Sequence, residues 1–453
     1  MKTSTLRDLI AIALPMVISQ GAFAVMIFTD RFFMSMISPM HMSASLGGGV
    51  AFHFCLSLFL GMLSYANALV AQYYGRKQFD KCSRVLTQGI ILSVLSLPLL
   101  VIITIFTGGM FAAMGHDPEQ AELEKTYYYV LMWGSFFVLI KTCLGCFFSG
   151  IGQTQKVMIA DIIGVALNVP LSYAMIFGKA GFPEMGIVGA GVGTIISNVI
   201  SLAIFIAFYS HHSVRIRFNL AQSFRLDSGI IKRYVRLGLP SGMEMFLNVA
   251  AFNLFLLMFQ SYGIAEGASA AIVFNWDILS FVPMMGINIG IVSLIGRYVG
   301  AGNMEKTNEV IASGFLLALG YSALLATVFV VFRQPLVELF ITEGVEYDDI
   351  RELASFMMLG LASYVMADAT ILVVGGVLRG AGDTRWLMIT SVIMHWLMLV
   401  AQYVVIKVLK YGPKASWMIF TVMILSIAVV YLIRLFGQRW RDPEVLKQVM
   451  AEH

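Results

Sequence analysis

The sequence predicts an all-α polytopic membrane protein with twelve transmembrane helices in two pseudo-symmetric six-helix bundles. Three observations predict this fold: the composition, the recurrence of long apolar stretches, and an internal repeat. Of the 453 residues, 59% are hydrophobic and only 12% are charged, about half the charged share of an ordinary soluble domain. Such a chain cannot cover a water-facing surface, so it needs lipid around it.

Apolar stretches long enough to cross a bilayer as helices, about 20 residues each, recur along the whole chain. They lie near 9–35, 46–71, 86–107, 127–150, 157–177, 187–209, 237–260, 268–295, 310–332, 352–377, 386–406 and 415–435. The first stretch ends in charged Asp30 and Arg31 without a small-residue cleavage pattern, so we expect a retained span and no signal peptide. The connections between stretches are too short for a soluble domain.

An internal repeat relates the two halves of the chain. One constant offset in residue number aligns Leu14-Pro15 with Leu239-Pro240, Gly61 with Gly286, Tyr73-x-Gly75 with Tyr298-x-Gly300, Lys81 with Lys306, Val85 with Val310 and Gly89 with Gly314. A slightly larger offset aligns Gly150-x-Gly152-x-Thr154 with Gly380-x-Gly382-x-Thr384. Six spans separate equivalent points, so both copies enter the membrane in the same sense, related by an axis along the membrane normal. We predict an N-terminal bundle at 1–210, a cytoplasmic linker at 211–236, a C-terminal bundle at 237–438 and a cytoplasmic tail at 439–453.

The distribution of charge predicts the orientation. Most of the 30 Lys and Arg residues fall in the termini and in the connections that twelve spans place on one side, which we expect to be cytoplasmic. The connections near 117–124 and 343–349 on the opposite side are acidic. The net charge of +4 is therefore explained by topology, and no nucleic-acid binding is expected. Cys143 and Cys146 form a C-x-x-C inside a span, where we interpret them as small packing residues.

Charged residues inside the spans are candidates for function, because a charge costs at least about 2.5–3.5 kcal/mol at the centre of a membrane helix. They are Asp30, Lys141, Asp161, Glu244, Asp277 and Asp368. Polar pairs one helical turn apart accompany some of them: Glu244 with Asn248, Tyr364 with Asp368, and Asn168 with Ser172 beside Pro170. Carboxylate, amide and hydroxyl oxygens suit a small cation, and a half-buried carboxyl equally suits a proton, so H⁺ and Na⁺ both stay open.

The alternative to a functional role is a structural one. For Asp30 and Asp368 that role would be pairing with Arg31 or Lys141, and we favour function. Glu244 is also interpreted as functional, whereas capping or solvation explains Asp161 and Asp277 equally well, since they lie nearer span ends. Lys141 could pair with an acid or reach the interface. His53 and His395 are interpreted as hydrogen-bonded packing groups.

Several short motifs, in order and at family-like spacing over nearly the full length, resemble the multidrug and toxic compound extrusion (MATE) family. They are Leu14-Pro15, Thr29-Asp30, the run from Gly150 to Thr154, Asn168, the run from Gly186 to Thr194, Gly238-Leu-Pro240, Asp368, and the run from Val377 to Thr384. The resemblance implies two six-helix bundles around a central cavity, export of organic, often cationic compounds, and coupling to inward flow of H⁺ or Na⁺.

The resemblance also implies roles for particular residues. Asp30 looks like the cation-coupling acid of the N-terminal bundle, with Asn168 and Thr194 as polar partners and a possible Na⁺ at Asp30 and Asn168. Tyr364 and Asp368 look like the corresponding pair in the C-terminal bundle.

The chain departs from the family pattern in two places. Ser172 stands where some members have a second acid. Asn248 stands where some have a glutamate, with Glu244 one turn earlier. The predicted coupling site is thus Asp30, Asn168, Ser172 and Thr194, and the predicted second-bundle site is Glu244, Asn248, Tyr364 and Asp368. Asp277 and Gln20 are candidates for a substrate cavity.

The sequence therefore predicts a secondary antiporter of the bacterial inner membrane, monomeric, with both termini cytoplasmic, that exports drugs or organic cations in exchange for H⁺ or Na⁺ by alternating access. A flippase for lipid-linked oligosaccharides and a membrane channel remain alternatives. We expect no enzyme activity and no cofactor, because we find no His-rich metal set, nucleophile elbow or phosphate loop.

Overall fold

The computed structural model describes residues 3–111, 117–340 and 348–452, and these residues contain helices and no strand. Among them, eleven helices are long and apolar enough to cross a membrane, and a further pair bent by 48° makes a twelfth span if it crosses as one. This confirms the predicted fold class. The acidic stretch at 343–347 lies outside the described residues.

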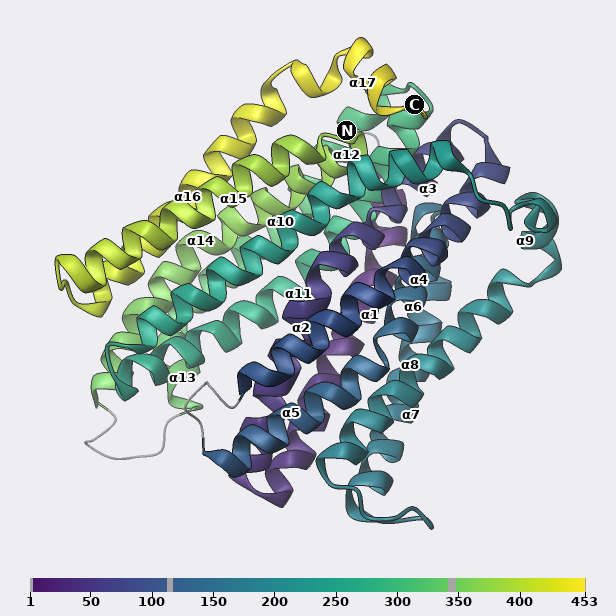
Figure 1. The fold of residues 1–453 in the computed structure, drawn as a ribbon. Helices are drawn as coiled ribbons and strands as arrows, with labels where there is room; N and C mark the ends of the chain where they lie inside the picture. Colours follow the sequence, from purple (N-terminus) through teal and green to yellow (C-terminus); the bar gives the residue numbers. More distant parts are fainter. Residues whose placement is uncertain (1–2, 112–116, 341–347, 453) are drawn as a thin grey trace.

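The N-terminal half contains α1 (Thr3–Ile37), α2 (Pro39–Ser64), α3 (Ala66–Gly75), α4 (Phe79–Met110), the bent pair α5 (Pro118–Trp133) and α6 (Ser135–Gly150), α7 (Thr154–Phe177) and α8 (Ile187–Tyr209). The short helices α9 (His212–Arg217) and η2 (Leu220–Gln222) connect it to the C-terminal half. That half contains α10 (Ser228–Gln260), α11 (Ile264–Gly300), α12 (Met304–Val331), α13 (Arg333–Glu338), α14 (Asp348–Ala381), α15 (Thr384–Tyr403), the π-helix η4 (Val404–Val408), α16 (Pro413–Phe436), η5 (Arg439–Arg441) and α17 (Pro443–Val449) (Figure 1).

Most of the helices extend beyond the predicted apolar stretches, whereas α8 has the predicted bounds. The largest differences are at the starts of α5 and α10, and α10 begins at Ser228, inside the stretch expected to be a polar linker. The side chain of Asp227 accepts a hydrogen bond of 3.1 Å from the backbone N–H of Ile230 and so caps the helix. Polar turns can continue a membrane helix because their backbone hydrogen bonds lie within the helix, whatever solvent surrounds it. Hydropathy therefore found the spans but not the helix ends.

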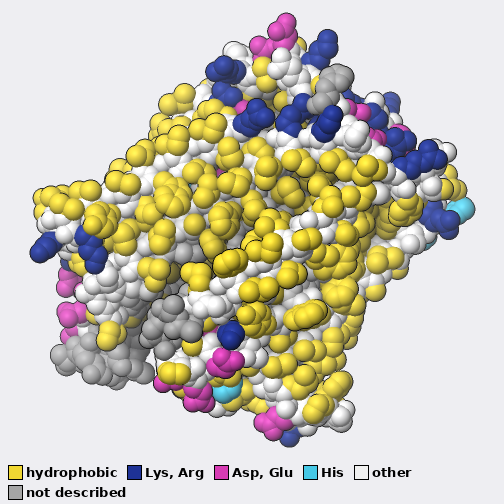
Figure 2. All heavy atoms as spheres, viewed as in Figure 1, with side chains coloured by type: hydrophobic (Ala, Val, Ile, Leu, Met, Phe, Trp, Pro, Cys, Tyr) yellow, Lys and Arg dark blue, Asp and Glu magenta, His cyan; other side chains and the backbone are white. Residues whose placement is uncertain are grey.

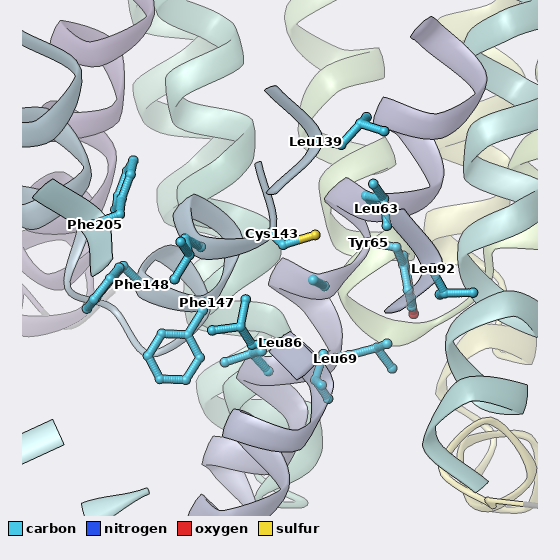
Figure 3. Close-up of a cluster of buried hydrophobic side chains, with 14 of the residues drawn as sticks. Leu63, Tyr65, Leu69, Leu86, Leu92, Leu139, Cys143, Phe147, Phe148 and Phe205 are labelled. Atoms are coloured by element: carbon cyan, nitrogen blue, oxygen red, sulfur yellow. The ribbon is translucent and has the colours of Figure 1, made fainter. Parts of the chain in front are cut away.

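Each bundle has its own apolar core. Figure 3 shows part of the N-terminal core, where Leu63 and Leu69 from α2 and α3 lie near Cys143 and Phe147 of α6. The thiol of Cys143 is free and fully buried. This agrees with its interpretation as a packing residue. In the C-terminal bundle an aromatic core includes Phe255, which lies almost parallel to Phe420 with the ring centroids 4.7 Å apart.

The two bundles pack through contacts that obey the internal repeat. A Cβ added to Gly61 of α2 would lie 2.8 Å from Cα of Gly242 in α10, and one added to Gly286 of α11 would lie 2.5 Å from the backbone N of Val17 in α1. The offset between the two copies converts one of these contacts into the other, since it moves Gly61 to Gly286 and Val17 to Gly242. The bundles are therefore related by a pseudo-two-fold axis between them.

A second symmetric pair of contacts lies near one end of the molecule. A Cβ on Gly75 of α3 would overlap the carbonyl oxygen of Arg297 in α11, and one on Gly300 would overlap the carbonyl oxygen of Gln72. The same offset exchanges these contacts too. Only glycine permits so close a backbone approach, which explains the glycine that both copies carry in the Tyr-x-Gly motif.

The outer surface is divided into a wide hydrophobic band and two charged ends (Figure 2). Lys and Arg side chains gather at the end that carries both chain termini, α9 and α17, which we call the basic end. In Figure 1 the two bundles lie against each other near the basic end and separate toward the opposite end. The closest inter-bundle contacts described above thus hold the basic end closed.

Candidate functional site

Two of the polar groups predicted for the N-terminal bundle, Ser172 and Thr194, lie at Asp30. The hydroxyl of Thr194 on α8 donates a hydrogen bond of 2.8 Å to Oδ2 of Asp30 on α1. Ser172 of α7 lies close to this carboxyl but makes no hydrogen bond of normal geometry with it, and Asn168 lies one turn before Ser172 on the same helix face. We call these four residues the Asp30 site. The side chains of Asn168 and Ser172 are fully buried, and Asp30 is 6% exposed.

Most of the polar atoms in the Asp30 site have no hydrogen-bond partner among the described residues. They are Oδ1 of Asp30, both amide atoms of Asn168 and the hydroxyl oxygen of Ser172. No Lys or Arg of the described chain pairs with Asp30. Burying polar groups without partners is costly. A carboxylate oxygen, an amide oxygen and a hydroxyl without partners belong to the ligand types that suit a small cation.

Glycines of α8 place Thr194 against α7. A Cβ added to Gly189 would lie 2.7 Å from the carbonyl oxygen of Met175, and a Cβ on Gly193 would overlap Oγ of Ser172. These two glycines are one turn apart, so they form one face that contacts the backbone of α7. The glycine-rich run that begins α8 thus brings the hydroxyl of Thr194 within reach of Asp30.

Asp161 and Lys141 form an ion pair nearer the basic end of the same bundle. Nζ of Lys141 on α6 lies 2.9 Å from Oδ1 of Asp161 on α7. The hydroxyl of Ser19 on α1 donates to the other carboxylate oxygen, and Lys141 also contacts the amide oxygen of Asn198 at 3.4 Å. Of the two possibilities for Lys141, pairing is the one observed, and the pair ties α1, α6 and α7 together.

The predicted second-bundle site divides into two separate groups. Glu244 of α10 accepts a hydrogen bond of 2.8 Å from Nη2 of Arg379 near the end of α14. Asn248, one turn along, donates a hydrogen bond of 2.7 Å to the hydroxyl of Ser391 on α15. Glu244 and Asn248 are therefore bound to side chains that the prediction did not include.

Tyr364 and Asp368 of α14 instead lie with Asp277 of α11. The carboxyls of Asp277 and Asp368 interact electrostatically, and Tyr364 interacts with both. The Tyr364 hydroxyl and Oδ1 of Asp277 make no hydrogen bond of normal geometry among the described residues, so this contact is only partly formed. The ring of Tyr364 packs on Phe420 of the aromatic core. We call Asp277, Tyr364 and Asp368 the two-acid site; Asp277, predicted apart from the other two, belongs to it.

The remaining candidates have simpler surroundings. Gln20 is partly exposed on α1 beside Ser19, and His53 is exposed on α2. Nδ1 of His395 donates to the backbone carbonyl of Ser391 at 2.7 Å, which fits the packing role predicted for it.

Sequence reasoning missed the pairing of Glu244 with Arg379, although Arg379 lies in the quoted motif that ends α14. Two facts could have indicated this pair. Arg379 lies in the last turns of a membrane helix, and a buried acid such as Glu244 requires a partner.

Comparisons with known proteins place this geometry in a family. The MatE family model matches residues 15–174 and 240–404, which together cover more than half of the chain. The chain therefore belongs to the MATE family of membrane transporters. The two matches begin at Pro15 and Pro240, which are equivalent prolines of the internal repeat.

Curated relatives and solved structures are similar to this chain over almost all of its length. A probable multidrug resistance protein NorM of Pasteurella multocida is 26% identical over 95% of this chain and 93% of its own length. One from Shewanella oneidensis is 28% identical over 86% and 84%. A MOP superfamily transporter from Pyrococcus furiosus matches with a TM-score of 0.87 at 19% identity, covering 97% of each chain. An outward-facing multidrug resistance MATE transporter matches with a TM-score of 0.85 at 19% identity over 98% of this chain and 97% of its own. At such identities these structures show the fold alone.

Proposed function

We propose that this protein exports organic, mainly cationic or amphipathic compounds across the bacterial inner membrane in exchange for H⁺ or Na⁺. The observation that carries the proposal is the Asp30 site, a buried carboxyl with a hydroxyl donor, no basic partner among the described residues and open oxygen ligands around it. The names of the NorM relatives, which describe multidrug resistance, support drugs as the cargo.

Alternating access would couple the two fluxes. A cation bound at Asp30 neutralises the carboxylate and satisfies the open oxygens, which favours one packing of α1, α7 and α8 over another. Cargo and cation then compete for that packing, so entry of the cation promotes release of the cargo outside. A ligand shifts such an equilibrium only by its difference in affinity for the two states. Here the difference in affinity would come from the charge of the bound cation, because no Lys or Arg of the described residues neutralises the Asp30 carboxylate in its place.

The basic end would face the cytoplasm. Lys and Arg collect there, and short connections rich in these residues stay on the cytoplasmic side of bacterial membranes (Figure 2). Both termini would then be cytoplasmic, and the end where the bundles separate would face outward.

The pairing of basic residues inside the spans argues against the alternative of a lipid-linked oligosaccharide flippase. Such cargo carries a pyrophosphate, which requires free positive charge in the cavity. Two basic residues within the spans, Lys141 and Arg379, are each paired with an acid, and Asp30 adds an acid without a basic partner among the described residues. Export of cations is therefore the better fit.

Drug efflux from proteoliposomes tests the proposal. The purified protein should drive a fluorescent organic cation against its gradient when a pH gradient or, separately, a Na⁺ gradient is imposed, and the gradient that works identifies the coupling ion. Cargo on the opposite side should accelerate exchange, as an antiporter requires. Cargo flux that dissipates its own gradient and ignores both ion gradients would contradict antiport and indicate a channel.

A further inference from the structure

The C-terminal segment returns across the basic end of the molecule after α16. Residues 443–452 consist of α17 and the three residues that follow it, and they lie beside the chain termini and α3 (Figure 1). The side chain of Asp442 caps α17 by accepting a hydrogen bond of 2.8 Å from the backbone N–H of Glu444. We call residues 443–452 the C-terminal strap.

Two arginines of α10 hold the end of the C-terminal strap. Arg233, which is fully buried, donates from Nε to the carbonyl oxygen of Val449 at 3.0 Å. Arg236 donates from Nη2 to the carbonyl oxygen of Ala451 at 2.7 Å and to that of Gln448 at 3.2 Å. The last carbonyls of a helix have no partners within it, so the guanidinium groups satisfy acceptors that would otherwise be open.

The strap then crosses to the N-terminal bundle. Oε1 of Glu452 accepts a hydrogen bond of 2.7 Å from Nζ of Lys81 on α4 and one of 2.9 Å from the hydroxyl of Tyr73 on α3. Val449 packs against the core of the N-terminal bundle, whereas Met450 belongs to a core of the C-terminal bundle. The strap is thus attached to both bundles.

The strap also fits a turn of the C-terminal bundle. Gly382 lies between α14 and α15 with φ of 93°, and a Cβ added to it would overlap Cγ1 of Val449. A side chain at Gly382 would therefore strain the backbone and displace Val449 as well. These two constraints explain why glycine stands at position 382.

The strap covers a direct bond between the bundles. Nε2 of Gln72 on α3 donates 2.8 Å to the carbonyl oxygen of Gly380 on α14, and Arg233 donates to the amide oxygen of the same glutamine. The guanidinium of Arg233 also lies 4.8 Å from the centre of the Tyr73 ring. Arg233 therefore joins the strap to the place where the two bundles meet.

We propose that the C-terminal strap is a latch that holds the basic end closed and must release Lys81 and Tyr73 before the bundles can separate there. This inference rests on the proposed alternating access. It adds that the bonds of Glu452 to Lys81 and Tyr73 control the opening of the basic end. It sets how often the basic end opens, because each opening must break the bonds of Glu452 as well as the contacts between the bundles.

The carboxyl group of Glu452 stays ionised near neutral pH. Burial alone would raise the pKa of Glu452, but the hydrogen bonds from Lys81 and Tyr73 and the charge of Lys81 outweigh burial and the opposing charge of Asp227, so the pKa lies below its ordinary value. The stabilisation is therefore complete above the ordinary pKa of a free glutamate and is lost as the pH falls through the lowered value of the docked strap. Changes in cytoplasmic pH near 7 leave it intact.

Distance measurements between spin labels at Arg215 on α9 and Asn308 on α12, both exposed, test the latch in the full-length protein. The hydroxyl of Ser83 on α4 donates a hydrogen bond of 2.7 Å to the carbonyl oxygen of Phe218, which attaches the end of α9 to the N-terminal bundle. Glu452→Gln and Lys81→Gln should each raise the population of the state with the longer distance by about tenfold, the effect of losing a charge-assisted hydrogen bond. The double variant should do no more than either single one, since both remove the same bond. Glu444→Gln removes an exposed acid from the same segment and should leave the populations unchanged.

The outcomes separate the latch from the proposed function. If added cargo opens the basic end of the wild-type protein but Glu452→Gln and Lys81→Gln populate the open state no more than Glu444→Gln does, the latch is wrong and alternating access stands. If the basic end stays closed in the wild type with cargo and in all of these variants, alternating access and the latch are both contradicted.

Discussion

Asp30 in the N-terminal bundle and Phe255 in the C-terminal bundle occupy equivalent positions of the repeat. Asp30 accepts a hydrogen bond from Thr194, whereas Phe255 is stacked on Phe420 inside an aromatic core. The offset that aligns Gly150 with Gly380 likewise aligns Asn168 with Met398, which is buried. The same helical frame thus holds an open polar site in one half and apolar packing in the other.

Each bundle nevertheless contains an acid inside a predicted span that pairs with a base. Asp161 pairs with Lys141 in the N-terminal bundle, and Glu244 pairs with Arg379 in the C-terminal bundle. A paired acid keeps its charge balanced whatever cation is present, so it stabilises the fold and cannot respond to the cation. For the proposed coupling, the candidate acids are therefore those inside the spans that have no basic partner among the described residues, Asp30 and the two-acid site.

The two kinds of unpaired site differ in how many charges they must balance. Asp30 is a single carboxyl that one cation neutralises. Asp277 and Asp368 repel each other if both are ionised, and one proton or cation between them removes that repulsion. Asp30 is also accompanied by polar atoms of Asn168 and Ser172 that have no hydrogen-bond partner among the described residues, which leads us to propose that coupling lies at Asp30.

The largest expected effect is that of Asp30→Asn. Asparagine keeps the size of the side chain but removes the charge that binds the cation, so gradient-driven export should be abolished while the protein still reaches the membrane. Efflux of a fluorescent cation from cells, with immunoblotting of the membrane fraction, measures both. Export at the wild-type rate would refute the assignment of coupling to Asp30.

Breaking a paired acid should instead destabilise the fold. Arg379→Met leaves Glu244 buried and unpaired, and should lower the free energy of unfolding by about 3–5 kcal/mol. Thermal unfolding in detergent measures the loss, and the double variant Arg379→Met with Glu244→Gln should recover much of it. An unchanged melting temperature in the single variant would show that this pair does not support the bundle.

Thr194→Val should weaken binding of the coupling cation by about tenfold, because a hydrogen bond to a charged group contributes about 1.5–3 kcal/mol. The cation concentration that gives half-maximal export measures this, and Thr194→Ser, which retains the hydroxyl, is the matched control. Equal behaviour of the valine and serine variants would remove Thr194 from the site.

The smallest effect is expected at the two-acid site. Asp277→Asn and Asp368→Asn, singly, should change the cation concentration that gives half-maximal export by less than about twofold, an energetic difference of about 0.4 kcal/mol. Cargo affinity is a separate readout for the same proteins. A loss of cation-driven transport as complete as that of Asp30→Asn would make the bundles equal in coupling.

The sequence predicted the fold almost completely, and its physical basis explains why. Apolar length marks each span, and the paired glycines at 75 and 300 are where backbones of the two halves approach each other. The Asp30 site was predicted from motifs, and the structure brings Asp30, Ser172 and Thr194 together.

The arrangement of the C-terminal acids could not be predicted in the same way. Glu244 and Asp368 are both acids in membrane helices, and spacing along α10 and α14 does not reveal that one meets Arg379 and the other Asp277. That depends on the rotation of helices about their axes, which packing sets. The role of the strap was also hidden, because a short polar tail has no hydropathy signal and gains its structure only from the surface it covers.

Cation uptake coupled to cargo export, measured in proteoliposomes with a cation-sensitive dye, tests the central claim most directly. The wild type and the double variant Asp277→Asn with Asp368→Asn should both take up cations when cargo is supplied, and Asp30→Asn should take up none. Cargo-dependent uptake that persists in Asp30→Asn and disappears in the double variant would place coupling in the C-terminal bundle and contradict the account.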